Sequence, residues 1–224
     1  MIRVISFDLD GTVVDKDFDN VFWFKEVPKV YARKNNVSID AAWEKVLVEY
    51  KALRGHKKWT DPMFWLVEHF DLLEEREVRQ MITDLKGNAK LYPDVLPALN
   101  SLKGEFELAV LTHSTREFVE VKMQAEQVSA FFSKVFSVPS DLGGMEKDEL
   151  VYSRLLKEFN ASPEEAVHVG DHYRFDYEVP KKVGMHAFYL DRQRERQGEH
   201  VVHDLKEFAG KVKALNATPA GVLE

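Results

Sequence analysis

Hydrophobic and polar positions follow two different patterns along the chain. Five short runs rich in apolar and β-branched residues are each followed by a helix-like or turn-rich stretch. Such runs are typical of parallel strands whose two faces are both covered by helices. The predicted strands are Ile2–Phe7, Phe106–Thr112, Val135–Val138, Ala166–Gly170 and His186–Leu190. This pattern predicts an α/β fold, with a Rossmann-like parallel sheet core flanked by helices.

Capping signals mark the helices that are predicted between these strands. The sequence Ser114–Glu117 reads as a capping box at the head of a helix that runs toward Gln127. Ser162–Glu165 reads as a second box, with proline at the first helical position. Proline is disfavoured inside helices, so Pro180 is predicted to start a helix that ends at Gly184.

A long helical segment separates the first predicted strand from the second. Residues 15–90 carry apolar side chains at 3.6-residue spacing and contain all four tryptophans. We expect them to form an all-helical inserted domain with an aromatic core. Residues 1–14 and 91–215 are expected to form the sheet domain, and 216–224 a disordered tail.

Composition narrows the classes of function. The formal net charge of −7 argues against nucleic acid as a partner, because phosphate backbones favour basic surfaces. The chain has no cysteine, which excludes disulfides, thiolate metal sites and cysteine nucleophiles. No apolar stretch approaches the roughly 20 residues of a membrane span, and the N-terminus has no signal-peptide pattern. We expect a cytoplasmic, monomeric protein without a membrane partner.

Two aspartates directly follow the first predicted strand. Asp8 and Asp10 are two positions apart, so their carboxylates point to the same side. At the carboxyl edge of a parallel sheet, they lie where open α/β folds bind ligands. Neighbouring carboxylates repel each other, which raises a pKa or requires a cation, and one can act as nucleophile while the other acts as acid. Taken alone, this Asp-Gly sequence also fits an ordinary turn after a strand.

Three further polar motifs follow later strands. Thr112 closes the second strand, where its hydroxyl can donate to a phosphate oxygen. Lys147 and Asp148 precede a predicted helix, and Asp171 and Asp176 follow the fourth strand. Carboxylate oxygens with open water positions suit Mg²⁺ better than Zn²⁺. Singly, a threonine at a strand end or a lysine between acidic residues is also common without any catalytic role.

In this order, the four motifs resemble those of the haloacid dehalogenase superfamily, opening with Asp-Leu-Asp-Gly-Thr at residues 8–12. The resemblance implies that Asp8 attacks phosphorus and that Asp10 moves the leaving-group proton. It also implies that Thr112 binds the phosphate and that Lys147 neutralises its charge. The proline that usually follows this lysine in the family is absent.

The resemblance further implies a bound Mg²⁺. Candidate metal ligands are Asp8, Asp10, Asp171 and Asp176. Asp176 is also expected to hold Lys147 or a metal-bound water. Dehalogenases of the superfamily use no metal and lack the second aspartate of the opening motif. Asp10 and Asp171 therefore favour phosphoryl chemistry over dehalogenation.

We accordingly expect a Mg²⁺-dependent phosphatase that hydrolyses a small phosphorylated metabolite through an aspartyl-phosphate intermediate. A sugar phosphomutase has the same motifs, and a non-catalytic phosphate-binding protein is a more distant alternative. The insertion stands where the family carries a helical cap, and its basic loop contributes Arg54 and Lys57 as candidate substrate contacts. Lysines in loops are commonly only solvated. His113, beside Thr112, is a further candidate contact.

Overall fold

The computed structural model describes residues 1–217, in which six parallel strands form one sheet in the order β3-β2-β1-β4-β5-β6. The strands are β1 Val4–Phe7, β2 Glu107–Thr112, β3 Lys134–Ser137, β4 Ala166–Gly170, β5 His186–Leu190 and β6 Val201–Val202. The predicted α/β fold is confirmed, and five strands lie close to their predicted bounds. The two-residue β6 was not predicted.

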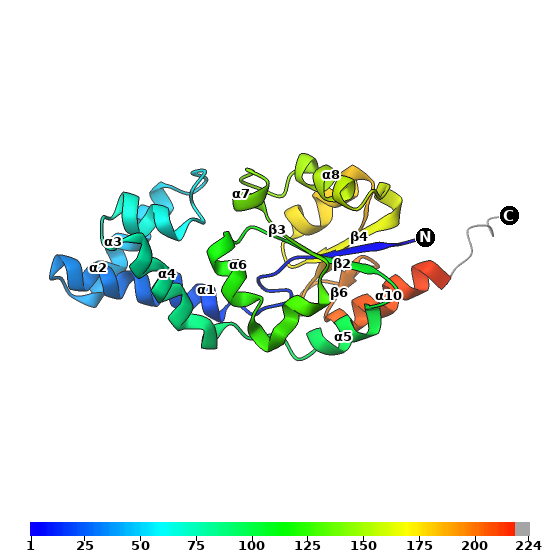
Figure 1. Ribbon diagram of the computed structural model, residues 1–224, viewed down its shortest axis with the longest axis horizontal. Helices are drawn as coiled ribbons and strands as arrows, with labels where there is room; N and C mark the ends of the chain where they lie inside the picture. The colour runs from blue at the N-terminus through cyan, green and yellow to red at the C-terminus, as the bar shows by residue number, and fades with distance from the viewer. Residues whose placement is uncertain (218–224) are drawn as a thin grey trace.

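Helices cover both faces of this sheet, with α5 and α10 on one side and α8 on the other (Figure 1). The helices of the sheet domain are α5 Val95–Leu102, α6 Arg116–Lys122, α7 Val138–Asp141, α8 Glu149–Glu158, α9 Val179–Val183 and α10 Leu205–Ala217. Alternate residues of β1 serve the two layers: the Phe7 ring packs against Phe208 at 5.7 Å, whereas Val4 is buried with Val151 of α8. Burial on both faces explains why the strands are continuously apolar.

The insertion between β1 and β2 is helical, as predicted, and forms the blue-to-cyan end of the molecule in Figure 1. Its segments are α1 Asp17–Val21, a π-helical segment Phe22–Glu26, α2 Val27–Asn35, α3 Ile39–Ala52, a second π-helical segment Phe64–His69, α4 Glu75–Asp84 and a 3₁₀ turn Leu85–Asn88. The chain leaves and re-enters the sheet domain at adjacent points, since Val14 bridges Leu91 and the Asp15 amide donates to the Lys90 carbonyl at 2.8 Å. This pairing brings the two ends of the insertion together at the sheet domain.

Buried side chains continue from the sheet into the insertion. Phe18 and Phe22 pack edge-on against Phe118 of α6, with ring centroids 5.2 and 4.8 Å apart. They belong to one hydrophobic cluster that extends from Phe7 in the sheet to Trp65 in the insertion. The insertion is therefore packed directly onto α6, the helix that follows β2.

The two predicted capping boxes differ in outcome. The box at Ser114–Glu117 is wrong: Thr115 is the N-cap of α6, and no side chain caps the helix there. The box at Ser162 is formed, with reciprocal bonds between Ser162 and Glu165. It closes only the 3₁₀ turn Pro163–Glu165 and no α-helix.

The bounds of two further helices test the predictions. Helix α6 ends at Lys122, short of Gln127, and the left-handed residues Glu126 and Gln127 lie in the following 3₁₀ segment Ala125–Phe131. Pro180 is in the first turn of α9, as predicted for a helix start, although the π-helical segment Tyr173–Glu178 leads directly into that helix. The wider hydrogen-bonding pattern of a π-helix changes the turn that precedes the proline. The predicted end at Gly184 is confirmed by its left-handed φ of 96°.

Helix α10 extends two residues into the predicted tail. The Asn216 side chain accepts a hydrogen bond from the Ile2 amide at 2.6 Å and donates to the Ile2 carbonyl at 2.9 Å. This pair fixes the end of the helix to the start of β1. The rest of the predicted tail, 218–224, lies outside the described residues. Among helices of the described part, none is long and apolar enough to cross a membrane.

Candidate active site

The loop after β1 brings the two motif aspartates to the carboxyl edge of the sheet. The Asp8 amide donates to the Val169 carbonyl at 2.9 Å, which extends the pairing of β1 and β4 by one residue. Gly11 then turns the chain with a left-handed φ of 85°. A Cβ at Gly11 would overlap the Asp171 carboxylate. Glycine is therefore required both by the turn and by the close approach of the two strands' loops.

Arg192 holds the loop after β1 in place through several hydrogen bonds. Its guanidinium donates to the Thr12 carbonyl at 2.7 Å, to the Gly11 carbonyl at 3.2 Å and to Asp94 at 3.0 Å. One side chain thus holds the loop after β1 to the segment where the chain re-enters the sheet domain. Sequence reasoning missed Arg192, which stands outside every motif.

Lys147 lies between two aspartates and is almost fully buried. Its ammonium contacts Asp8 at 2.6 Å and Asp176 at 2.7 Å. Burial raises the pKa of Asp8 to about 8, although Lys147 opposes the shift. Burial would also raise the pKa of Asp176, but Lys147 and His168 outweigh it and hold that pKa well below its usual range. Lys147 is therefore in direct contact with Asp8, the predicted nucleophile.

Asp148 and His113, which lie beside Lys147, are both held by hydrogen bonds to backbone amides. Asp148, where the family usually has proline, is the N-cap of α8 and accepts a hydrogen bond from the Val151 amide at 2.9 Å. The Lys147 amide donates to Nε2 of His113 at 3.0 Å. Burial and the Lys147 ammonium lower the pKa of His113 to about 3. His113 therefore accepts this bond as a neutral ring.

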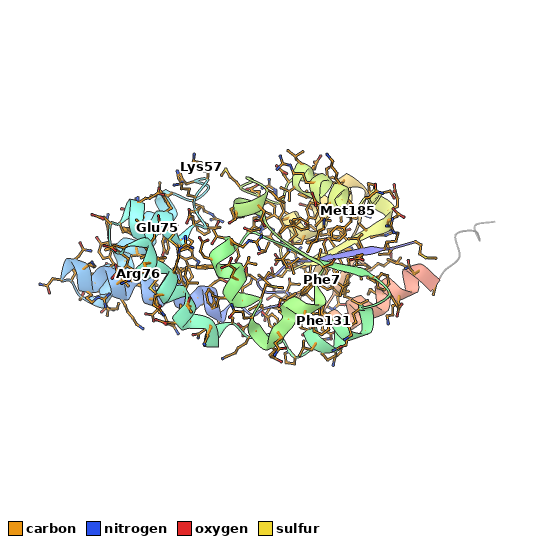
Figure 2. All side chains as sticks on the ribbon, viewed as in Figure 1. Phe7, Lys57, Glu75, Arg76, Phe131 and Met185 are labelled. Carbon is orange, nitrogen blue, oxygen red and sulfur yellow. The ribbon has the colours of Figure 1, made fainter. Side chains whose placement is uncertain are left out.

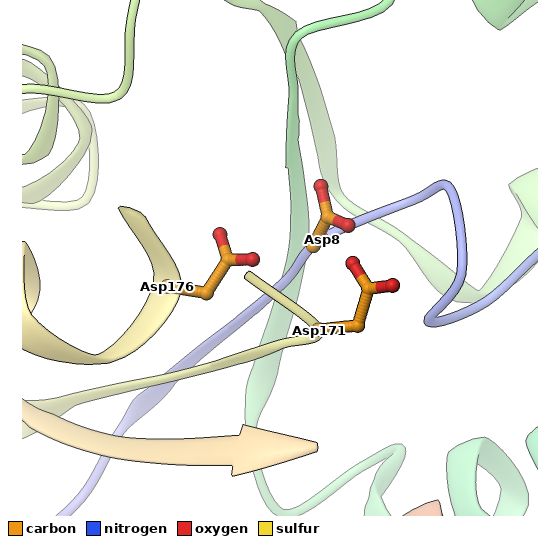
Figure 3. A group of neighbouring side chains, drawn as sticks. All are labelled: Asp8, Asp171 and Asp176. Atoms are coloured by element: carbon orange, nitrogen blue, oxygen red, sulfur yellow. The ribbon is translucent and has the colours of Figure 1, made fainter. Parts of the chain in front are cut away.

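Asp8, Asp171 and Asp176 form a group that could hold a metal ion (Figure 3). One carboxylate oxygen from each lies within 4.8 Å of the others. Three hard oxygen donors with no nitrogen or sulfur fit Mg²⁺. Lys16 contacts Asp171 at 2.5 Å at the edge of this group. The carboxylate of Asp10, also a predicted ligand, lies outside it.

Asp10 is held instead by a second lysine. Ser114 donates to Asp10 at 2.6 Å, Lys122 contacts it at 2.5 Å, and Thr112 lies 3.5 Å away. Lys122 also contacts Asp19 of α1 at 2.7 Å. Burial alone would raise the pKa of Asp10, but Lys122 outweighs it and lowers that pKa. Sequence reasoning missed Ser114, Lys122 and Asp19.

These groups line one cleft of about 450 Å³, called here the carboxylate cleft. Its wall includes all the predicted catalytic residues and His113. Arg54 and Lys57 line an adjacent cleft of about 490 Å³, which shares His113 and His172 with the first. Lys57 lies on the loop of the insertion that faces the sheet domain (Figure 2). The structure therefore places both residues beside the carboxylates and not among them.

Residues 2–184 match the haloacid dehalogenase-like hydrolases. The chain belongs to this family. The predicted resemblance and the prediction of a hydrolase are thereby confirmed. The family match covers the motif residues, the insertion and all the strands through β4.

Named relatives within the family share about a quarter of their residues with the chain. It is 25% identical to the GMP/IMP nucleotidase YrfG of Escherichia coli, covering 76% of this chain and 74% of the relative. It is also 25% identical to the glyceraldehyde 3-phosphate phosphatase of Pyrococcus furiosus, over 97% and 95% of the two chains. The crystal structure of a HAD phosphatase from Thermococcus onnurineus matches with a TM-score of 0.80 at 24% identity, covering 94% of this chain and 98% of that one. At that identity, the structural match supports the fold alone.

Proposed function

We propose that the chain is a Mg²⁺-dependent phosphatase that hydrolyses a small phosphate monoester through an aspartyl-phosphate on Asp8. The observation that carries this proposal is the meeting of three groups in one cleft. Asp8 offers a carboxylate oxygen for attack, Lys147 contacts it at 2.6 Å, and Asp10 lies in the same cleft on a separate hydrogen-bond network. Two carboxylates held in different surroundings can act as nucleophile and as acid.

The charges around Asp8 support a bound metal. Asp8, Asp171 and Asp176 would hold Mg²⁺. When bound, the ion would neutralise negative charge on the nucleophile and on a phosphate oxygen. The raised pKa of Asp8 is consistent with a group that needs a further cation to stay ionised.

Asp10 is suited to move a proton in both halves of the reaction. An arriving phosphate adds negative charge beside Asp10, which raises its pKa and favours the protonated form that a leaving alkoxide needs. Once the alcohol has left, Lys122 and Ser114 stabilise Asp10 as the carboxylate that deprotonates water. Thr112 and Lys147 would bind the phosphate oxygens, since both line the same cleft.

The insertion would act as the cap that closes over this cleft. Trp59 and Thr60 of the insertion line the carboxylate cleft together with Asp8. Closure by such a segment would exclude water from the first step and add substrate contacts. Arg54 and Lys57, in the adjacent cleft, would contact an anionic or polar part of the substrate.

The deciding experiment measures inorganic phosphate released from p-nitrophenyl phosphate and a panel of small phosphate esters, with Mg²⁺ and with EDTA. We expect release that requires Mg²⁺. Asp8→Asn should abolish turnover while the circular dichroism spectrum stays native. Retained turnover in Asp8→Asn would refute the mechanism. Transfer of phosphate to a second sugar without free phosphate would identify a phosphomutase instead.

Substrate identity is not decided by the carboxylates. The named relatives act on a nucleotide and on a triose phosphate, and both are small phosphate esters. Any such ester would present the same phosphate to Asp8 and Lys147. Cytoplasmic location and a monomeric state stay predictions.

A further inference from the structure

A third cavity, lined by residues of the insertion, adjoins the carboxylate cleft. It has a volume of about 300 Å³, within the usual range for small-molecule sites, and is called here the aromatic cavity. Its lining consists of Trp23, Phe24, Leu47, Tyr50, Lys51, Arg54, Trp59, Thr60 and Trp65. Four of these residues, Trp23, Phe24, Trp59 and Thr60, also line the carboxylate cleft. A substrate whose phosphate lies on Asp8 can therefore extend into this cavity.

Three of the four polar ring groups in the lining are hydrogen-bonded within the protein. The indole nitrogen of Trp59 donates to the Tyr50 carbonyl at 3.1 Å, and that of Trp65 donates to the Trp59 carbonyl at 2.8 Å. The Tyr50 hydroxyl donates to the Trp23 carbonyl at 3.3 Å. The rings thus present mainly faces and edges to a ligand, while Lys51, Arg54 and Thr60 supply the polar groups of the lining. A polyhydroxylated sugar would find few hydrogen-bonding partners among the rings.

Two rings at the mouth of the cavity are unusually exposed. Trp59 is 41% exposed and Phe24 is 45% exposed. Within the described part of the chain, the Trp59 ring has no aromatic partner, so its face is open to a ligand. Large apolar side chains exposed beside a reactive cleft are typical of a ligand-binding surface.

Arg54 adds a cation at the boundary of this surface. It lines both the aromatic cavity and the adjacent cleft that contains Lys57. Among the described residues, its guanidinium has no ion pair or hydrogen-bond partner. A free guanidinium can stack on an aromatic ring or donate to acceptor atoms on the ring edge. An aromatic heterocycle satisfies both the rings and the arginine.

We propose that the aromatic cavity binds the leaving group of the substrate and selects phosphate esters whose alcohol carries a flat heteroaromatic ring of nucleobase size. This substrate class rests on the proposed phosphatase function. The ring stacks on Trp59 and Phe24, with Arg54 at its edge, while the phosphate lies on Asp8. Non-aromatic esters such as glycerol phosphate reach the same carboxylates without these contacts.

The test compares kcat/KM for inosine monophosphate and for glycerol 3-phosphate in the native chain and in three variants. We expect the native chain to prefer inosine monophosphate. In Trp59→Ala and in Phe24→Ala, the ratio of the two kcat/KM values should fall roughly tenfold, mainly through KM, as expected for lost base stacking. Trp43→Ala is the matched control, since Trp43 is 45% exposed in the insertion but lines neither cleft nor the aromatic cavity. Its ratio should not change.

A binding measurement separates this proposal from the proposed activity. Inosine monophosphate should quench tryptophan fluorescence in Asp8→Asn, which cannot turn over, and inosine should inhibit glycerol phosphate hydrolysis by the native chain. If neither ester is hydrolysed but quenching is seen and is weakened by Trp59→Ala, the phosphatase function fails and the binding site stands. If esters are hydrolysed without preference and inosine neither binds nor inhibits, the aromatic selection is refuted.

Discussion

Two buried lysines at the carboxyl edge of the sheet each contact two aspartates, but only the group around Lys147 includes a third carboxylate. Lys147 shares its ammonium between Asp8 and Asp176, and Asp171 adds a third carboxylate to the group. Burial and the neighbouring carboxylates raise the pKa of Asp8 to about 8 despite the lysine. Asp8, the proposed nucleophile, therefore requires a further cation for full ionisation.

Around Lys122 the two carboxylates are affected in opposite directions. The Lys122 ammonium contacts Asp10 at 2.5 Å and Asp19 at 2.7 Å, and it outweighs burial in lowering the pKa of Asp10. Burial and the neighbouring Asp10 raise the pKa of Asp19 to about 7. Asp19 belongs to α1, so this lysine also ties the insertion to the aspartate proposed to move protons. In the group around Lys147 the raised pKa falls on the proposed nucleophile, whereas around Lys122 it falls on Asp19 and leaves the proposed proton carrier ionised.

Lys147→Ala is expected to have the largest effect. Turnover should fall roughly a thousandfold, because the nucleophile and the phosphate lose their fixed cation. In EDTA, the free energy of unfolding should fall by about 3–5 kcal/mol, since Asp8 and Asp176 lose the cation that they share, although Asp176 keeps its bonds to His168 and to the His172 amide. Mg²⁺ should restore part of this stability in urea unfolding.

The control for this variant is Lys134→Ala, which removes a surface lysine paired with Glu158. The free energy of unfolding of this control should differ from that of the native chain by less than about 1 kcal/mol. Mg²⁺ should stabilise the control as much as it stabilises the native chain. If Mg²⁺ stabilises Lys147→Ala no more than this control, the three carboxylates are not the metal site.

Lys122→Ala sharpens the comparison. We expect turnover to fall roughly a hundredfold, because Asp10 loses the cation that orients it. Stability should fall as well, but Mg²⁺ should not restore it, since Asp10 and Asp19 lie outside the metal-binding group. Asp19→Asn should cost less than about tenfold, because Lys122 still holds Asp10. Equal rescue of both lysine variants by Mg²⁺ would remove the distinction between the two groups.

Three of the motif residues could be predicted because each stands at the end of a strand. Asp8, Thr112 and Asp171 follow apolar runs, and parallel strands bring such ends to one edge. Lys122 could not be placed in this way, because its partners Asp10 and Asp19 lie 112 and 103 residues earlier. Only tertiary packing brings them together.

One local signal for Lys122 was present in the sequence. It stands four residues after Phe118, which places it on the same face of α6 as that buried ring. A lysine on the apolar face of a helix needs a buried partner. In the structure its ammonium lies 5.1 Å from the rings of Phe18 and Phe118 and pairs with the aspartates.

Apolar runs predicted most strands of the fold, whereas the shortest strand and one helix end left no clear pattern in the sequence. The five apolar runs predicted five strands, whereas Val201–Val202 is too short to show a periodic pattern. The end of α6 was missed because no glycine or proline follows Lys122 to mark it, and the left-handed residues Glu126 and Gln127 come only later. The capping box at Ser114 failed because its hydroxyl bonds to Asp10, a partner that the local sequence does not reveal.

Lys16→Ala tests whether Lys16 weakens Mg²⁺ binding at the proposed metal site of Asp8, Asp171 and Asp176. Lys16 contacts Asp171 at 2.5 Å while its side chain stays largely exposed. Removing this positive charge should tighten Mg²⁺ binding roughly threefold to tenfold, a modest change because solvent screens exposed charges. Isothermal titration of the native chain and of Lys16→Ala with Mg²⁺, in the absence of substrate, measures it. Lys29→Ala, which removes an exposed lysine paired with Glu26, is the control and should leave Mg²⁺ affinity unchanged.

His113→Gln tests the pH dependence of stability. Burial and Lys147 lower the pKa of His113 to about 3, against about 6.5 in the unfolded chain. The unfolded chain therefore binds one more proton than the folded chain between these values, so stability falls as pH falls through this window. The glutamine keeps an acceptor for the Lys147 amide but does not titrate, which should flatten the dependence by up to about 1.4 kcal/mol per pH unit. Urea midpoints at pH 7, 5.5 and 4.5 measure the slope.

His186→Gln is the control and should flatten the pH dependence less, since burial also lowers the pKa of His186 but its ring is only half-buried. Parallel curves for the native chain and His113→Gln would show that the ring is protonated in the folded state.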